Sequence, residues 1–197
     1  MKIRTHISVS LDGFVADADG LSSWEALPHF DGDSHGYNAF MAGCGAVVIG
    51  RATFDQALSG WLEEWPWPGL PVFVLTSSPL SADAPDSVIA SMGGPAGLVE
   101  QIRAAGIESD VQLLGGPRTI EAFIAVGGLD ELGIVVLPLL LGSGVPLFSA
   151  EAKPFSPERW AASRVTPVEA PPRPLFELVR HETFADGSMH LVYAPTR

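Results

Sequence analysis

The chain has 197 residues and carries 11 Lys and Arg against 23 Asp and Glu, which gives a formal charge of −12. This excess of negative charge repels the phosphates of nucleic acid and anionic membrane surfaces, so we expect neither as a partner. With 47% hydrophobic residues and a mean hydropathy of +0.26, the chain has apolar surface for one packed core, and we expect a single domain over residues 1–197.

The cysteine content and the N-terminal sequence indicate in which cellular compartment the protein is expected. A single cysteine, Cys44, allows no internal disulfide and no cysteine-based metal cluster, which favours a reducing environment and a small buried thiol. The start, MKIRTHISVSLDG, reaches a polar turn too early for a signal peptide, and no run approaches the ~18 apolar residues of a membrane span. We therefore expect a soluble cytoplasmic protein.

Five apolar segments have the composition of β-strands. Several are apolar on both faces, as the central strands of a covered sheet must be. In chain order the segments are HISVSL at 6–11, GAVVIG at 45–50, PVFVLT at 71–76, VQLLG at 111–115 and LGIVVLPLLLG at 132–142.

Helical patterns lie between these strands. One begins at Pro95 and another at Pro117, and Gly127 ends the second. Their expected inward-facing residues are Leu98, Val99 and Ile102 in the first, and Ile120, Phe123 and Ile124 in the second. The alternation predicts an α/β domain with helices on both faces of a largely parallel sheet.

The tail changes character at residues 175–194. Two strand-like segments flank Asp186 and Gly187, a dipeptide that is typical of tight hairpin turns. We expect this hairpin to add antiparallel strands to one edge of the sheet.

Two Gly-x-Gly sequences were candidates for a dinucleotide fingerprint, which must follow a strand and begin a helix. The first, at 43–45, precedes its strand, and the second, at 142–144, runs into Val145 and Pro146, where a helix does not readily start. There is also no Walker lysine motif and no zinc-like spacing of His or Cys, so we expect no metal.

Polar turns follow three of the predicted strands. They are the Gly-Arg-x-Thr segment at 50–53, the Thr-Ser-Ser segment at 76–78 and the Gly-Gly-Pro-Arg-Thr segment at 115–119. Alone, Arg51 would be an ordinary surface charge, and the Gly-Gly pair is equally well explained as a tight turn. In open α/β sheets, however, ligands bind outside the carboxyl ends of the strands, so three such turns together favour a nucleotide phosphate site.

The same motifs, in this order and spacing, resemble the dihydrofolate reductase-like superfamily. More closely, they are similar to its branch related to the C-terminal reductase domain of bacterial riboflavin biosynthesis. The motifs are SVSLDGFVA at 8–16, VVIGRATF at 47–54, VFVLTSS at 72–78, LLGGPRTI at 113–120 and LDELGIVVLPLLLGSGVPLF at 129–148.

This resemblance implies a mixed, mostly parallel central sheet with flanking helices, NADPH as cofactor, and hydride transfer to a small nitrogen heterocycle. It implies that Arg51 binds the 2′-phosphate of NADPH, where a planar guanidinium suits phosphate oxygens. It also implies that backbone at Ser8 and Val15 holds the nicotinamide carboxamide. The remaining implied cofactor-binding residues are Gly50, Thr53, Thr76, Ser77, Ser78, Gly115, Gly116, Arg118 and Thr119.

A reductase also needs an acid to deliver a proton. Similarity to the folate reductases, which place a carboxylate after a Trp and a Leu-Pro, makes Asp31 the leading candidate, with Asp33 or His35 as substitutes. Each could equally cap the helix predicted over 34–43. Asp12 is a further candidate of lower weight, because Asp-Gly is a preferred turn pair.

Two residues depart from the families that the chain resembles. Val135 stands where folate reductases usually have a supporting threonine, and Leu114 stands where riboflavin-pathway reductases often have a glutamate. A non-catalytic nucleotide-binding or partner-binding module therefore stays open as the alternative. Trp61, Trp65 and Trp67 are interpreted as a loop folded onto its own aromatic rings.

The apolar segment at 134–142 is larger than one edge of this core needs. We therefore expect a homodimer that buries part of this segment or part of the tail hairpin.

Overall fold

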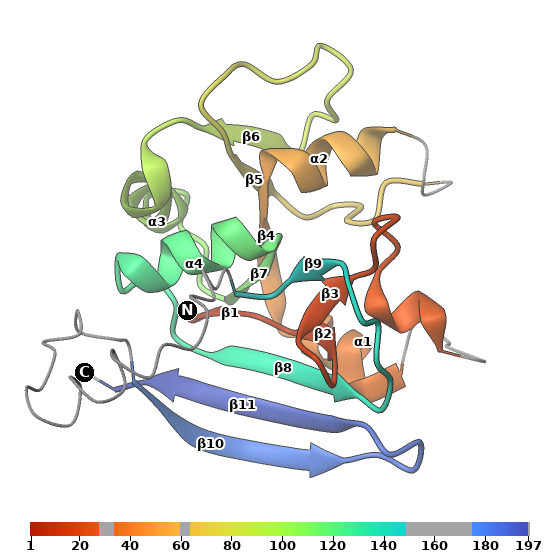
Figure 1. Cartoon of the computed structure of the whole chain (residues 1–197). Helices are drawn as coiled ribbons and strands as arrows, with labels where there is room; N and C mark the ends of the chain where they lie inside the picture. Colours follow the sequence, from red (N-terminus) through yellow and green to blue (C-terminus); the bar gives the residue numbers. More distant parts are fainter. Residues whose placement is uncertain (28–33, 60–63, 149–174, 197) are drawn as a thin grey trace, which may run out of the picture.

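The computed structural model describes residues 1–27, 34–59, 64–148 and 175–196 (Figure 1). Its larger sheet has five strands, and every neighbouring pair in it is parallel. In spatial order the strands are β1 (Ile3–Arg4), β7 (Asp110–Gly115), β4 (Cys44–Gly50), β5 (Val72–Leu75) and β6 (Val88–Ser91). The mostly parallel sheet predicted from the sequence is confirmed.

A second sheet continues from the first through the N-terminal segment. In spatial order its strands are β10 (Phe176–Thr183), β11 (Met189–Pro195), β8 (Leu132–Leu137) and β2 (Ile7–Ser10). The strands β2 and β8 are parallel, whereas β11 runs antiparallel to both of its neighbours. The strand predicted over 6–11 is therefore preceded by a separate short strand, so that β1 pairs with β7 and β2 pairs with β8.

The Thr5 side chain explains this change of partner. The Thr5 hydroxyl donates to the Gly133 carbonyl oxygen over 3.1 Å and accepts from the Gly133 N–H over 2.9 Å. These two bonds replace a backbone pair of the ladder, so the chain can leave β7 and join β8 without losing buried hydrogen bonds.

Helices cover both faces of the five-stranded sheet, as predicted. On one face, Ala46 and Val48 of β4 share a core with the helices α3 (Gly94–Ala104) and α4 (Pro117–Ala125). On the other face, Val47 and Ile49 pack with the helix α2 (Arg51–Leu58), and Met41 of the helix α1 (Tyr37–Ala42) packs against the same core. The predicted inward residues of α3 are buried, as are Ile120 and Phe123 of α4, while Ile124 is partly buried.

The strand predicted over 132–142 ends earlier than expected. The strand β8 stops at Leu137, because Pro138 has no N–H to continue the ladder. A loop follows, and then β9 (Val145–Pro146) pairs with β3 (Phe14–Ala16). Two short 3-10 helices, η1 (Ser23–Ala26) and η2 (Ser34–Gly36), complete the described elements.

The predicted hairpin is present, with Gly187 at a φ of 87° in the turn between β10 and β11. Trp65 and Trp67 pack edge to face, and Trp67 is buried, as the loop interpretation predicted. Trp61 lies outside the described residues.

Within the described residues, no helix is long and apolar enough to span a membrane. Nor do three or more His, Cys, Asp or Glu side chains gather there as a metal site would require. Cys44 is buried and free.

Candidate functional site

The carboxyl ends of four parallel strands meet at one edge of the larger sheet. Register places Gly50 beside Leu75, Ile49 beside Gly115, and Leu75 beside Ser91. Because the strands point the same way, the turns that follow them are neighbours in space. The three polar turns identified in the sequence are thereby brought together.

Arg51 joins the first turn to the second. As the first residue of α2, it donates from Nε to both oxygens of Asp55, over 2.8 and 3.0 Å. Its Nη1 donates to Ser78 Oγ over 2.9 Å and to the Pro79 carbonyl oxygen over 3.0 Å. The side chain is 37% exposed, so the guanidinium is held in one orientation while part of it still faces solvent.

Thr76 shapes the second turn from inside. Its hydroxyl donates to the Ser78 carbonyl oxygen over 2.9 Å and accepts from the Ser78 N–H over 3.2 Å. Ser77 and Ser78 are both exposed. The structure therefore gives Thr76 a supporting position and leaves the two serines at the surface.

Thr53 joins the first turn to the third, because its hydroxyl accepts from the Gly116 N–H over 3.1 Å. The peptide bond between Gly115 and Gly116 is cis, and Gly115 has a φ of 109°, a conformation that favours glycine. A second close approach lies beside it, because a Cβ added at Gly50 would collide with Thr119 Oγ1. The first turn is thus packed tightly against the start of α4.

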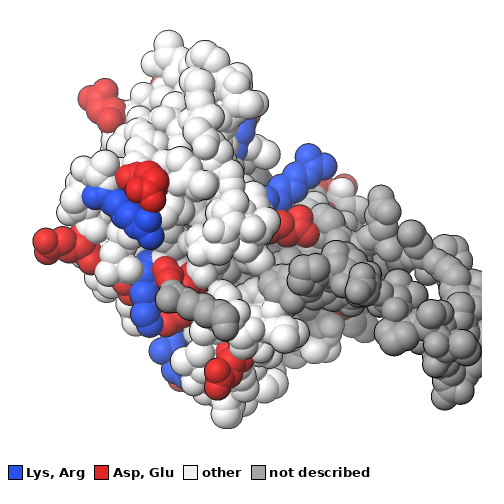
Figure 2. Space-filling model, turned by 90° about the vertical axis from the view of Figure 1, so that its left-hand side faces the viewer, with Lys and Arg blue, Asp and Glu red and all other residues white. Residues whose placement is uncertain are grey.

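Arg118 is the second cation at this edge. It is exposed, and within the described residues it makes no hydrogen bond or ion pair. Elsewhere the charges are mixed: Figure 2 shows basic and acidic side chains interspersed on the face it presents. In a chain with a formal charge of −12, the charge of Arg51 is balanced by Asp55, so Arg118 supplies the positive charge at this edge at which an anion could bind.

The turn after β6 lies at the same edge and was missed in the sequence. The Ser91 carbonyl oxygen accepts from the Thr76 N–H over 3.1 Å, and Met92, which follows it, is 57% exposed. A signal was available, because Gly93, Gly94 and Pro95 repeat the Gly-Gly-Pro pattern of residues 115–117 at the end of another strand.

Ser8 and Val15 belong to other strands, β2 and β3. The Ser8 carbonyl oxygen accepts from Ser23 Oγ over 3.2 Å, and Ser8 lies in register with Val135 of β8. Val135 is fully buried, and Leu114 packs against the core that contains Phe54. Both positions that depart from the related families are thus apolar packing positions.

The candidate acids are only partly described. Asp31 and Asp33 lie outside the described residues. His35 is buried at a φ of 67°, and its Nε2 lies 2.8 Å from Asp186 Oδ2 in the hairpin turn.

Asp12 has a well-defined structural environment. It accepts from Ser10 Oγ over 2.5 Å and from the N–H groups of Leu141 and Gly142 over 3.2 and 2.7 Å. The bond from Ser10, followed by those backbone bonds, lowers the pKa of this carboxyl group. A carboxylate held ionised in this way is a poor proton donor near neutral pH, so the geometry favours an anchor for the loop after β8.

A polar cluster that the sequence did not indicate lies between the sheets and α1. It contains His6, His190, Tyr37 and Gln112, all from distant parts of the chain. The only sequence signal was a histidine in the otherwise apolar strand segment at 6–11.

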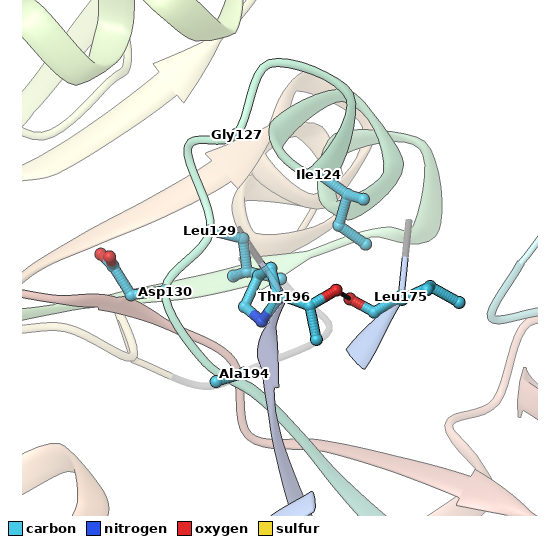
Figure 3. Close-up of a pocket in the computed structure, with 8 residues that line it drawn as sticks. Ile124, Gly127, Leu129, Asp130, Leu175, Ala194 and Thr196 are labelled. Atoms are coloured by element: carbon cyan, nitrogen blue, oxygen red, sulfur yellow. Dashed lines mark hydrogen bonds between the residues drawn. The ribbon is translucent and has the colours of Figure 1, made fainter. Parts of the chain in front are cut away.

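A cavity of about 360 Å³ lies beside the C-terminal end of β11 (Figure 3). It is lined by Ile124, Gly127, Leu129, Asp130, Leu175, Ala194, Pro195 and Thr196. The Asp130 carboxylate there accepts from the Ile3 N–H over 2.8 Å, and Thr196 Oγ1 donates to the Leu175 carbonyl oxygen over 3.1 Å. The described residues of its lining include no Lys or Arg that could bind a phosphate.

Comparisons with known proteins show the family and the fold of the chain. The model of the RibD C-terminal domain matches residues 1–187. The uncharacterized protein YwjB of Bacillus subtilis is 31% identical over 148 residues, which cover 75% of this chain and 82% of YwjB. The riboflavin biosynthesis protein RibD of Mycobacterium tuberculosis is 30% identical over 146 residues, which cover 70% of this chain and 42% of that protein.

Solved structures give the same fold. A Shewanella sp. PV-4 protein named for riboflavin biosynthesis has a TM-score of 0.78 and 28% identity, with 100% of both chains covered. The dihydrofolate reductase of Enterococcus faecalis has a TM-score of 0.61 at 17% identity, with 100% of this chain and 97% of that chain covered. At that identity the second likeness shows the fold alone.

Proposed function

The chain belongs to the RibD C-terminal domain family, and on that premise we propose that it is an NADPH-dependent reductase that transfers hydride to a small heterocyclic acceptor. The acceptor class we propose is pteridine-like or aminopyrimidine-like.

The observation that carries the proposal is the cross-linking of three turns at one sheet edge. Arg51 ties the turn at 50–53 to the turn at 76–79, and Thr53 ties it to the turn at 115–119. Arg51 is a preorganised donor, held by its neighbours, and Arg118 adds an exposed positive charge at the same edge, which together suit an anionic ligand. The donor set fits the phosphates of a dinucleotide.

We assign the roles in this site as follows. Arg51, with Ser77 and Ser78, holds the 2′-phosphate, and Arg118 with the Gly115–Gly116 turn holds the pyrophosphate. Thr53, Thr76, Thr119 and Gly50 keep the turns in place, as their contacts indicate. Backbone at Ser8 and Val15 holds the carboxamide of the nicotinamide ring.

When bound, NADPH supplies a hydride, and the chain must supply a proton to the neighbouring atom of the acceptor. We propose Asp31 for this step, with Asp33 or His35 as the substitutes. Asp12 is the weakest candidate, since its oxygens already accept three hydrogen bonds.

The test is a fluorescence titration of the full chain with NADPH and with NADH, followed by addition of pteridines, aminopyrimidines and quinoid compounds. We expect NADPH to bind more tightly and its absorbance to fall with at least one acceptor. Tight binding without turnover on any acceptor would favour the non-catalytic nucleotide-binding module. The departures at Val135 and Leu114 from the related reductases are the reason to consider that module. Failure to bind either nucleotide would overturn the proposal.

A further inference from the structure

The helix α2 begins where β4 ends (Figure 1) and carries an arginine and an aspartate one turn apart on its surface. Arg51 Nε donates to both carboxylate oxygens of Asp55, over 2.8 and 3.0 Å. The two side chains are 37% and 54% exposed, so the carboxylate lies at the surface beside the guanidinium. An anion that reaches Arg51 therefore also meets Asp55.

Arg51 has few donors left for a ligand. The N–H groups of a guanidinium form two forks, and each fork can bind two oxygens side by side. Asp55 occupies Nε of one fork, and Ser78 Oγ and the Pro79 carbonyl oxygen occupy Nη1 of the other. Only Nη2, which the two forks share, has no hydrogen-bond partner within the described residues. A phosphate at this turn therefore meets one nitrogen rather than a complete fork.

The positive charge of Arg51 is also offset. The Arg51–Asp55 pair contributes no net charge, whereas a phosphate monoester carries close to two negative charges near pH 7. A carboxylate a few ångströms from such a phosphate repels it even in water, where the repulsion is worth about a tenfold change in affinity.

Asp55 has a second effect, which acts in the opposite direction. By holding the guanidinium in place, it reduces the side-chain entropy that is lost when a ligand binds. Ser78 and Pro79 hold Nη1 independently of Asp55, however, over 2.9 and 3.0 Å. The orientation of Arg51 is therefore retained without the carboxylate, and the repulsion is the larger effect of Asp55.

The same carboxylate suits a nucleotide that lacks the 2′-phosphate. In dinucleotide sites generally, an acidic side chain accepts a hydrogen bond from a ribose 2′-hydroxyl, whereas an arginine accommodates a 2′-phosphate. On α2 both kinds of side chain are in contact with each other. Within the described residues only Arg51 donates to the Asp55 oxygens, which leaves lone pairs for a hydroxyl group.

We propose that Asp55 determines the nucleotide selectivity of this chain, by repelling the 2′-phosphate of NADPH and by accepting a hydrogen bond from the ribose hydroxyl of NADH. The inference rests on the proposed function, because it concerns the nucleotide that the same turn binds. Asp55 narrows the preference for NADPH that Arg51 confers, so that the protein binds NADH as well.

The test measures the dissociation constants of NADPH and NADH for the full chain, by fluorescence titration at fixed low salt, where screening is weak. Asp55→Asn keeps the shape of the side chain and removes its charge. The ratio of the NADH to the NADPH dissociation constant should rise about tenfold, chiefly because NADPH binds more tightly. An unchanged ratio overturns the inference, and so does a lower one, which would show that Asp55 serves only to orient Arg51.

Two control variants separate this effect from a general change of charge. Asp55→Glu keeps the charge and should keep a ratio close to that of the wild type. Glu100→Gln removes the exposed carboxylate that pairs with Arg103 on α3, and so changes the net charge by the same amount as Asp55→Asn does. It should leave the ratio unchanged, and an equal rise in Glu100→Gln would overturn the inference.

The Arg51→Ala variant gives a second readout. It leaves the Asp55 carboxylate without its partner, so adding Asp55→Asn should recover NADPH affinity about tenfold and leave NADH affinity within about twofold. The absence of recovery would contradict direct repulsion by Asp55. A wild-type chain that binds neither nucleotide contradicts the proposed function itself, whereas an unchanged ratio in a chain that binds NADPH contradicts only the inference about Asp55.

Discussion

Arg51 is held in one orientation by its neighbours. Two of its nitrogens are fixed by Asp55, Ser78 and Pro79, so little side-chain entropy remains to be lost on binding. The third, Nη2, has no partner within the described residues. The Arg51 side chain is therefore held in one orientation at this strand end, as the proposed phosphate-binding role requires.

Arg51→Ala should weaken NADPH binding by about 1.5–3 kcal/mol, the usual cost of losing charged hydrogen bonds, and should hardly affect NADH, which lacks the 2′-phosphate. The measurement is the ratio of the two dissociation constants at fixed low salt, because salt screens exposed charges. Arg103→Ala is the control, since Arg103 is an exposed arginine paired with Glu100 on α3. Equal losses of affinity for both nucleotides would indicate that Arg51 binds the pyrophosphate or stabilises the fold.

His6 should make the free energy of unfolding depend on pH. Its pKa is about 3 in the folded protein against 6.5 for the unperturbed group, so the unfolded chain binds a proton that the folded chain excludes. The stabilisation is complete above about pH 6.5 and is lost as the pH falls towards 3, by about 1.4 kcal/mol per pH unit.

Urea unfolding of wild type and His6→Phe at pH 7 and pH 5 measures this effect. Wild type should lose about 2 kcal/mol more than the variant over this interval. The same pH dependence in His6→Phe and wild type would show that His6 is not the titrating group.

At the scale of elements, the site depends on how closely helices approach strand ends. Gly50 ends β4 where Thr119 of the helix α4 begins to pack, and no room is left for a Cβ. The loop after β8 is held in a similar way, by the bonds from Leu141 and Gly142 to Asp12 in the turn after β2. Both contacts join elements that are far apart in the chain and hold the loops and turns around the candidate site in place.

Gly50→Ala should destabilise the protein by about 1–3 kcal/mol through overpacking. Gly50 has a φ of −83°, which alanine adopts freely, so any loss reports the collision alone. Adding Thr119→Ala removes the hydroxyl that the new Cβ meets, and should recover most of the stability in a double-mutant cycle of urea unfolding.

Gly97→Ala is the matched control, because Gly97 lies within α3 with nothing within 4 Å of a new Cβ. This variant should be more stable by up to about 1 kcal/mol, as helix propensity predicts. Additive effects of Gly50→Ala and Thr119→Ala would contradict the packing explanation.

At the scale of the whole molecule, the edge strand β10 of the second sheet exposes apolar side chains and pairs with no strand on its outer side within the described residues. The strand β10 is the last in its sheet, and large apolar side chains stand on or beside it, with Leu175 at 69%, Leu178 at 46% and Val179 at 58% exposed. An edge strand with apolar side chains and free backbone groups tends to pair with another chain. We propose that a second copy covers it.

The chain should therefore sediment as a homodimer at micromolar concentration, and Val179→Lys should shift it towards monomer. Leu140→Lys is the control, because Leu140 is 71% exposed in the loop after β8, the other surface that we considered. Dissociation by Leu140→Lys with no effect of Val179→Lys would place the interface at that loop. A monomer in the wild type would contradict both.

Local sequence pattern was sufficient to predict most elements and the polar turns at the strand ends. Proline at Pro95 and Pro117, with apolar residues at helical spacing, predicted α3 and α4, and Asp186 with Gly187 predicted the hairpin. The convergence of the turns followed as well, because parallel strands in an open sheet place all their carboxyl ends at one edge. The individual elements depend on residues within a few positions of one another, whereas the convergence followed from the expected parallel sheet.

Only the tertiary structure decided which distant residues meet. The contact of His6 with His190, the exchange of hydrogen bonds between Thr5 and Gly133, and the anchoring of the 138–144 loop by Asp12 each join segments more than a hundred residues apart. Strand order and register set these contacts, and neither is encoded in the local periodicity of any one strand. The sequence therefore determined most of the chain's elements and the polar turns that follow its strands, whereas the buried histidine pair exists only because β2, β8 and β11 lie side by side.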